Sequence, residues 1–341
     1  MARLTVAGVT EVVIDSSLAL PLLPSRAGRS RAAILTQPAA TDIALDVARH
    51  LRDEDVTCEV IGLPDREEAK TLPVAGSVYE ALARFGLARD DTVVGVGGGS
   101  VTDLAGYVAG TWLRGVEAVY VPTTLLGAID ASIGGKTGVN IGGKNLVGVF
   151  WHPTRVVIDV ARLGSLPSYL IREGMAEAYK AGLIGNANLA ASIETSGLDT
   201  DLEEVVTSSI AVKADIVDRD VTEKGDRAFL NFGHTIGHAI EFASSLSHGE
   251  SVGLGMVAAV RISEKLAGFA HADRVIAAIA GLGLPTQVEG LELARVIDLL
   301  GRDKKRDAGG VRMVLLKELE APFLVHVDRA DIELGLTAIG F

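Results

Sequence analysis

The sequence predicts an α/β fold, with a parallel sheet in its first half and a mainly helical second half. Three observations support this prediction. Short β-branched runs alternate with amphipathic helical patterns up to residue 124. A run of glycines follows one of these buried runs, and long helical patterns dominate after Pro167. The 341 residues suit two domains, which we place at 1–163 and 164–341.

The elements of the first half are predicted in order. Short apolar runs bounded by turn residues predict strands at 32–36, 57–63 and 118–124, and 92–100 passes from a buried strand into a glycine loop. Apolar residues spaced three and four apart predict helices at 41–53, 74–86 and 103–115. Strands separated by helices pair in parallel, so this order indicates a Rossmann-like sheet with helices on both faces.

The second half is predicted to be a helical domain. Helical periodicity covers 168–185, 201–221, 228–243 and 250–268. A small strand pair is predicted near the end, at 310–319 and 322–328. Asp303, Lys304 and Lys305 form a charged run that we expect in a loop after a helix.

Composition excludes several classes of protein. A net charge of −12 argues against non-specific nucleic-acid binding, although converging cations could still hold an anionic substrate. The single cysteine, Cys58, permits no intramolecular disulfide and no cysteine-type zinc site. The sequence shows neither a signal-peptide pattern nor a run of about 20 apolar residues, so we expect a cytoplasmic protein without a membrane partner.

Three of the seven histidines fall in one short segment. His234 and His238 lie four residues apart, on one face of a helix, and His248 follows after a serine-rich break. Neutral imidazoles are common ligands of zinc-type cations, so the cluster indicates a metal site. The alternative is a helix with two polar histidines near a turn.

The glycine loop indicates a phosphate-bearing ligand. Gly97, Gly98 and Gly99 follow a strand and precede a helix, where backbone amides and the helix dipole favour an anion. A plain tight turn is the alternative. Asp103 could face a nicotinamide or ribose, or it could stabilise the helix dipole as a first-turn acid.

The segment 122–145 combines two threonines, Asp130 and two glycine–lysine repeats. We interpret it as a loop folded tightly around an anionic ligand, to which Asn145 adds hydrogen-bonding capacity. A β-hairpin with surface lysines is the alternative.

Glu177 and Lys180 share one face of an apolar helix, among Met, Ala and Tyr, so we expect the pair to be partly buried, which is more often functional; a surface ion pair is the alternative. Lys213, Arg227 and Asn231 are each typical of solvated polar residues when taken singly.

Together these motifs resemble the 3-dehydroquinate synthase family. The resemblance runs from about Pro64 to Leu316, and its strongest segments are GGGSVTDLAGYVAGTWLRG, VPTTLLGAIDASIGGKTGVNIGGKNLVG, GMAEAYKAGLI, LNFGHTIGHAIE, HGESVGLGM and DKK. Several long motifs in one order make chance similarity unlikely to explain them.

The resemblance implies roles for particular residues. A catalytic zinc, or cobalt in its place, would be held by Glu177, His234 and His248, with His238 as a nearby proton-relay residue. NAD would contact Glu67, Lys70, Gly98, Gly99, Ser100, Asp103, Thr123, Thr124 and Lys144, with Glu67 and Lys70 at its adenosine end. Substrate and catalytic positions would be Asp130, Lys136, Asn145, Lys180, Lys213, Arg227, Asn231, Lys304 and Lys305. Arg114 would reach the neighbouring subunit's phosphate site, which implies a homodimer.

The implied reaction converts 3-deoxy-D-arabino-heptulosonate 7-phosphate (DAHP) to 3-dehydroquinate and phosphate, in the shikimate pathway. It would proceed by transient oxidation with NAD, β-elimination of phosphate, re-reduction and intramolecular aldol closure. An anionic sugar acid accounts for the many lysines and arginines.

Three alternatives stay open at this point. A sister sugar-phosphate cyclase acting on sedoheptulose 7-phosphate would share the fold, NAD and zinc, but its substrate has no carboxylate. A metal-dependent polyol or alcohol dehydrogenase would show net NADH production. A catalytically silent scaffold or nucleotide-binding regulator would be expected to lack some of these residue types.

Overall fold

A computed structural model describes residues 1–16, 21–304 and 311–341. The chain divides into two compact units, Met1–Pro167 and Ser168–Phe341. The division expected from the sequence, between residues 163 and 164, lies in the short helix α4 (Val160–Gly164), shortly before the observed one.

The first unit is built on a seven-stranded sheet in the order β1-β2-β9-β6-β5-β3-β4. Its strands are β1 (Ala2–Val6), β2 (Thr10–Asp15), β3 (Arg31–Thr36), β4 (Thr57–Gly62), β5 (Thr92–Gly97), β6 (Glu117–Pro122) and β9 (Arg155–Asp159). All neighbouring strands pair in parallel except β1 and β2, which are antiparallel. The predicted Rossmann-like sheet is confirmed, and β1, β2 and β9 add an edge that the sequence reasoning missed.

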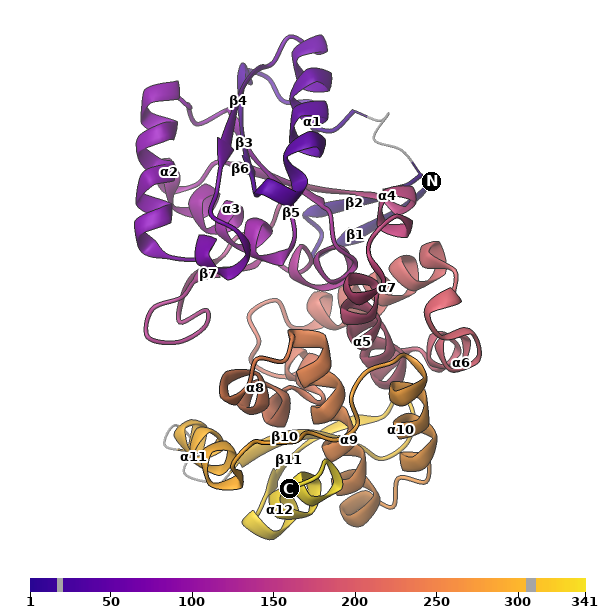
Figure 1. Cartoon of the computed structure of the whole chain (residues 1–341). Coiled ribbons are helices and arrows are strands. Elements are labelled where there is room, and N and C mark those ends of the chain that lie inside the picture. The colour runs from indigo at the N-terminus through magenta and orange to yellow at the C-terminus, as the bar shows by residue number, and fades with distance from the viewer. Residues whose placement is uncertain (17–20, 305–310) are drawn as a thin grey trace. The chain divides into compact units, whose positions relative to one another are not determined.

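Helices cover both faces of this sheet, with α1 on one side and α2 and α3 on the other (Figure 1). Their bounds are α1 (Thr41–Asp53), α2 (Leu72–Phe85) and α3 (Gly99–Thr111), with 3-10 turns η1 (Pro38–Ala40), η2 (Arg66–Ala69) and η3 (Trp112–Arg114). Val47 and Leu51 of α1 share a buried core with Ile34 and other strand residues. Because α3 begins at Gly99 and not at the predicted residue 103, Asp103 lies in its second turn.

The segment after β6 differs from the expected loop. After the π-helical turn η4 (Gly127–Ala131), strands β7 (Lys136–Val139) and β8 (Val147–Phe150) pair as an antiparallel hairpin. The glycines have a steric reason, because a Cβ on Gly148 would lie 2.1 Å from the carbonyl oxygen of Thr137. The predicted loop is therefore wrong over this hairpin, while its ligand-binding role stays a prediction.

The second unit is mainly helical, as predicted. Its elements are α5 (Ser168–Gly185), α6 (Ala187–Ser196), η5 (Gly197–Asp199), α7 (Leu202–Arg219), η6 (Asp226–Asn231), α8 (His234–Ala243), α9 (His248–Ala267), α10 (Ala272–Gly281), α11 (Leu293–Lys304), β10 (Val311–Leu316), β11 (Pro322–Val327) and α12 (Arg329–Ala338). β10 and β11 form the expected antiparallel pair.

Two local predictions in this unit were wrong. The single helix expected over 228–243 is interrupted, because Gly233 adopts a left-handed φ of 78° between η6 and α8. The loop expected at Asp303 and Lys304 is instead the last turn of α11. Lys305 lies outside the described residues.

Helix α9 packs against its neighbours at backbone distance. A Cβ on Gly255 of α9 would lie 1.8 Å from the carbonyl oxygen of Gly233, at the start of α8. A Cβ on Gly249 would lie 2.6 Å from the Cα of Glu173 on α5. Ser247 and Glu250 fix the start of α9 with a reciprocal capping box. Glycine therefore brings the start of α8 against α9 at Gly255, and the first turn of α9 against α5 at Gly249.

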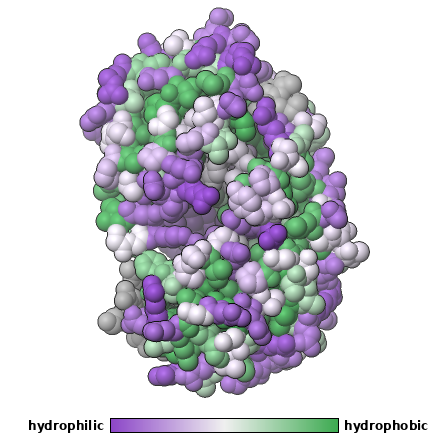
Figure 2. Space-filling view, in the orientation of Figure 1, coloured by the Kyte–Doolittle hydropathy of each residue, from purple (hydrophilic) through white to green (hydrophobic). Residues whose placement is uncertain are grey.

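Hydrophilic and hydrophobic residues alternate over the face shown in Figure 2. Among the described residues, no helix is both long and apolar enough to cross a bilayer.

The glycine contact of α9 predicts a sharp difference between two substitutions in one helix. Gly255→Ala should lower the free energy of unfolding by roughly 2–3 kcal/mol, because its methyl group overlaps a backbone carbonyl. Gly253→Ala is the matched control, since its Cβ would meet only ordinary contacts at 3.6 Å and should stabilise the helix by about 0.5–1 kcal/mol. Urea unfolding measures both, and equal stabilities would contradict the packing described.

Candidate functional site

Three metal-ligating side chains of the second unit converge on one point. Glu177 comes from the middle of α5, and His234 and His248 are the first residues of α8 and α9. Oε1 of Glu177 lies 3.3 Å from Nε2 of His234 and 3.5 Å from Nε2 of His248. The three ligand atoms lie within 4.8 Å of one another, which is the spacing a single cation requires.

The hydrogen bonds around this set leave its lone pairs facing inward. Nδ1 of His234 lies 3.1 Å from the carbonyl oxygen of Phe232, which can only accept, so Nδ1 carries the proton. The Nε2 lone pair then faces Oε1 of Glu177, a buried atom without a hydrogen-bond partner. Two acceptors facing each other in a buried place are stabilised by a cation between them, so the residues fit a divalent metal.

The electrostatics differ between the three side chains of the site. Burial alone would raise the pKa of Glu177, but Lys180, His234 and His248 outweigh it and hold that pKa well below its ordinary value. Burial, reinforced by Lys180, lowers the pKa of His234 to about 3, so this imidazole is neutral. Burial acts against a charge on His248 too, but the carboxylates of Glu177 and Glu241 raise its pKa to about 10.

Glu241 was missed from the sequence. Its Oε2 lies 3.5 Å from Nδ1 of His248, on the side of the ring away from Glu177. A carboxylate there can accept the Nδ1 proton and direct Nε2 to a metal. His238, Glu241 and His248 also have metal-ligand spacing, but His238 is exposed, so the buried set around Glu177 is the better cation site. Spacing offered a signal, because Glu241 follows His234 by two helical turns.

Lys180 pairs with the second oxygen of Glu177, and both side chains are buried, as expected. The other catalytic positions expected in this unit lie on three elements, α7, η6 and α8, the last of which carries His238. Lys213 is buried on α7, and Arg227 is 1% exposed on η6, where it donates to the carbonyl oxygen of Val221. The amide of Asn231, at the end of η6, lies 3.5 Å from Glu223. Lys304 ends α11.

The first unit gathers most of the expected cofactor positions around the start of α3. Gly98 is the N-cap of α3, and the amide of Thr123 donates to the carbonyl oxygen of Gly97. The hydroxyl of Thr124 accepts from the amide of Gly127, next to η4, where Asp130 lies. The backbone amides at this helix start suit an anionic group. Ser100 at the first turn of α3 donates to Gln37.

A second group in this unit surrounds Lys70. Its ammonium lies 2.6 Å from Asp103 on α3 and 2.6 Å from Asn145 in the connection between β7 and β8. Glu67 pairs with Lys70 at 3.6 Å and accepts from Asn140. Lys70 thus connects Asp103, an expected NAD contact, to Asn145, an expected substrate contact. Lys136, Lys144 and Arg114 are exposed residues of the same unit.

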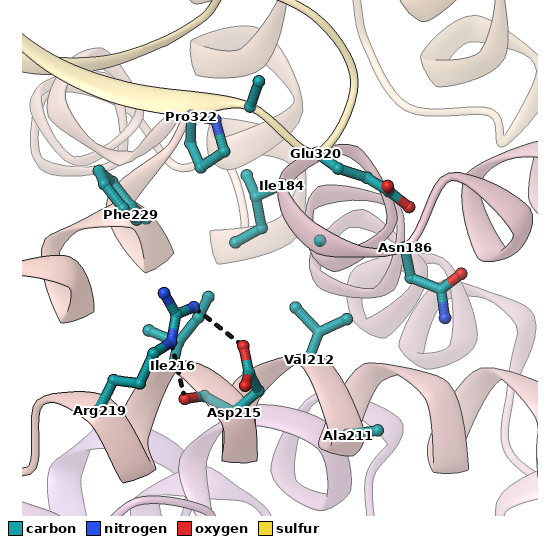
Figure 3. Close-up of a pocket in the computed structure, with 12 residues that line it drawn as sticks. Ile184, Asn186, Ala211, Val212, Asp215, Ile216, Arg219, Phe229, Glu320 and Pro322 are labelled. Carbon is teal, nitrogen blue, oxygen red and sulfur yellow. Dashed lines mark hydrogen bonds and ion pairs between the residues drawn. The ribbon is translucent and has the colours of Figure 1, made fainter.

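The described residues also enclose a pocket that none of the expected site residues lines. It measures 410 Å³ and is lined by Ile184, Val212, Phe229 and Pro322 among others (Figure 3). Arg219 at its edge is neutralised by Asp215. The chemistry is therefore concentrated elsewhere, around Glu177 and Lys70.

The fold and the site define a class: a Rossmann-like α/β unit joined to a helical unit in which a carboxylate and two imidazoles have metal-ligand spacing. Two sequence profiles match the chain in succession, 3-dehydroquinate synthase N-terminal over residues 60–173 and 3-dehydroquinate synthase C-terminal over 174–306. The chain belongs to the 3-dehydroquinate synthase family.

Individual relatives agree. The 3-dehydroquinate synthase of Mycolicibacterium vanbaalenii is 43% identical over 91% of this chain and 90% of its own length. The structure of 2-epi-5-epi-valiolone synthase from Streptomyces hygroscopicus, with NAD+ and Zn2+ bound, is 26% identical and superposes with a TM-score of 0.88 over 96% of each chain. A 2-deoxy-scyllo-inosose synthase with carbaglucose-6-phosphate, NAD+ and Co2+ also has a TM-score of 0.88, covering 99% of this chain and 100% of its own; at 24% identity it shows the fold alone.

The orientation of His248 predicts a graded loss of metal. Glu241→Gln should weaken zinc affinity by about 10–100-fold, because the amide no longer holds the Nδ1 proton in place. His248→Ala, which removes a ligand, should lose the metal at the same free zinc concentration. Competition with a fluorescent chelator measures both without an activity assay. Glu264→Gln, an exposed acid on α9, is the control. Unchanged affinity in Glu241→Gln would show that Glu241 does not orient the ligand.

Proposed function

We propose that the chain converts DAHP to 3-dehydroquinate and phosphate. The observation that carries the proposal is the buried carboxylate of Glu177, whose Oε1 faces Nε2 of both His234 and His248. Membership in the 3-dehydroquinate synthase family over both units supports the choice of substrate. The sister cyclases share the fold but are less similar in sequence.

The proposal requires two bound groups. A divalent metal held by Glu177, His234 and His248 supplies a Lewis acid for substrate oxygens. NAD bound at the start of α3 supplies a hydride acceptor that is regenerated in each cycle.

The remaining work falls to the chain's own residues. Lys180 holds the Glu177 carboxylate in its metal-facing orientation through an ion pair. His238, on the exposed face of α8, is assigned to proton transfer. Cations and amides are assigned to the carboxylate, phosphate and hydroxyl groups of the substrate: Lys136, Asn145, Lys213, Arg227, Asn231 and Lys304, with Asp130 as a hydroxyl acceptor and Lys305 outside the described residues. A substrate that carries a carboxylate and a phosphate accounts for these cations in a chain whose net charge is −12.

The decisive assay uses purified protein, zinc and catalytic NAD, and follows phosphate and dehydroquinate together. With DAHP we expect the two products in equal amounts and no accumulation of NADH, because the hydride is returned. Turnover of sedoheptulose 7-phosphate but not DAHP would assign the chain to the sister cyclases. Stoichiometric NADH would indicate a dehydrogenase.

We also propose that the protein acts as a cytoplasmic homodimer. Ile141, Leu146, Val147 and Phe150 are exposed apolar residues on the β7–β8 hairpin and its connection, and such a surface suits a self-complementary contact. Leu113 and Arg114 both adopt a left-handed φ, of 49° and 67°. Strain at two successive side-chain-bearing residues is typical of functional positions, which supports a functional role for Arg114.

The cross-subunit role of Arg114 predicts complementation between inactive variants. Arg114→Ala should lose turnover at low DAHP concentration, and His248→Ala should lose it at any concentration. When the two are unfolded and refolded together, the mixture should recover about a quarter of wild-type activity, because about half of the dimers are then mixed and each of these contains one complete site of two. Each variant refolded alone is the control. If the mixture stays inactive while mixed dimers form, Arg114 serves its own subunit.

A further inference from the structure

The ammonium of Lys70 joins two parts of the first unit that the proposed function assigns to different ligands. Lys70 is 4% exposed, and its Nζ lies 2.6 Å from Asp103 on α3 and 2.6 Å from Asn145 beyond β7. Glu67 is the third oxygen partner, at 3.6 Å. An ammonium has three N–H donors, of which Asp103 and Asn145 accept two, while Glu67 adds an ion pair.

The connection between β7 and β8, residues 140–146, is the loop that extends beyond β7 in Figure 1, and its first residue contacts the neighbourhood of Lys70. The backbone amide of Asn140 donates to the carbonyl oxygen of Lys70 at 2.8 Å, and its side chain donates to Glu67 at 2.8 Å. The Asn140 side chain in turn accepts from the amide of Asn145 at 2.8 Å. Asn145 has a left-handed φ of 54°, which asparagine tolerates better than most residues. The connection therefore takes its conformation largely from Glu67 and Lys70.

The carboxyl group of Asp103, which pairs with Lys70, responds to a new hydrogen-bond donor. Burial raises the pKa of Asp103 to about 6, although Lys70 acts in the opposite direction. Its carboxylate form is thus costly, and a hydroxyl group donating to it would stabilise that form. Such a group would strengthen the ion pair with Lys70 and fix the ammonium that also holds Asn145.

On the basis of the proposed function, we propose that Lys70 is a positioning residue that couples NAD at Asp103 to the order of the connection 140–146. Cofactor binding then arranges Asn145 before the substrate arrives. The coupling passes through one side chain inside one unit, with direct contacts of 2.6 Å on both sides.

Hydrogen exchange of the backbone amides in 140–146, with and without saturating NAD, tests the coupling. In the wild type, NAD should slow exchange by about tenfold, which corresponds to a coupling of about 1.4 kcal/mol. In Lys70→Met, NAD is raised to a concentration that saturates the variant. The exchange rate of 140–146 with NAD should then differ less than twofold from the rate without it. Lys70→Arg, which keeps the charge, should restore part of the response.

Thr124→Val is the matched control, because Thr124 is an assigned NAD contact outside the cluster. It should bind NAD more weakly but retain full protection of 140–146 at saturation. If Lys70 has only a structural role, Lys70→Met should change the exchange rate of 140–146 equally with and without NAD. The ratio of the rate without NAD to the rate with NAD therefore separates the two roles. If Lys70→Met does not fold, Asn145→Gly removes the other end of the contact and keeps the left-handed conformation available.

Two results would overturn the coupling: full protection by NAD in Lys70→Met or Asn145→Gly, or NAD binding to the wild type without any protection of 140–146. Absence of NAD binding to the wild type by calorimetry would instead overturn the proposed function, and the coupling with it.

Discussion

The close approach of α9 to α8 and α5 is the constraint on which the metal set depends. Ridges of ordinary side chains keep helix axes about 8–10 Å apart, and imidazole and carboxylate side chains must then reach across that gap. Gly255 and Gly249 remove the side chains at the two contacts, so backbone meets backbone. His234 and His248 can therefore both begin their helices within reach of one oxygen of Glu177. Helix packing, rather than a loop, sets the distance between the ligands.

Each unit also buries a lysine against a carboxylate, and the two pairs have different consequences. Burying one charge alone would cost several kcal/mol, so neither the lysine nor the carboxylate of each pair could be buried without its partner. Lys180 satisfies one oxygen of Glu177 and leaves the other directed at the imidazoles. Lys70 satisfies Asp103 but has donors left for Glu67 and Asn145. The first pair therefore fixes a ligand, whereas the second links segments that are distant in sequence.

The spacing of apolar residues along the sequence was sufficient to predict the features that depend on neighbouring residues in the chain. The alternation of strands and helices, the helical second unit and the burial of Glu177 with Lys180 could all be predicted from spacing. The break at Gly233 could not, because helical periodicity continues across it. Glycine is needed there for its left-handed φ of 78° and for close contacts with Met256 and Val252, which are distant in sequence. The β7–β8 hairpin was named only as the alternative to a ligand-binding loop for a related reason, since its glycines relieve cross-strand crowding that only the paired strands reveal. The contacts of Lys70 likewise require the folded sheet.

The three glycines of the loop before α3 look equivalent in the sequence, but their surroundings in the structure differ. A Cβ on Gly97 would lie 2.4 Å from the side chain of Val101, and one on Gly99 would lie 3.0 Å from Ala131, so packing alone accounts for these two. Gly98 has an ordinary φ of −76°, and its Cβ would meet only Thr124, at 3.4 Å. Neither conformation nor packing requires glycine there. The remaining reason is an approach of something else to the backbone at the N-cap of α3, where a pyrophosphate would gain most from bare amides. Gly98 is thus the glycine in this loop whose identity argues for a ligand.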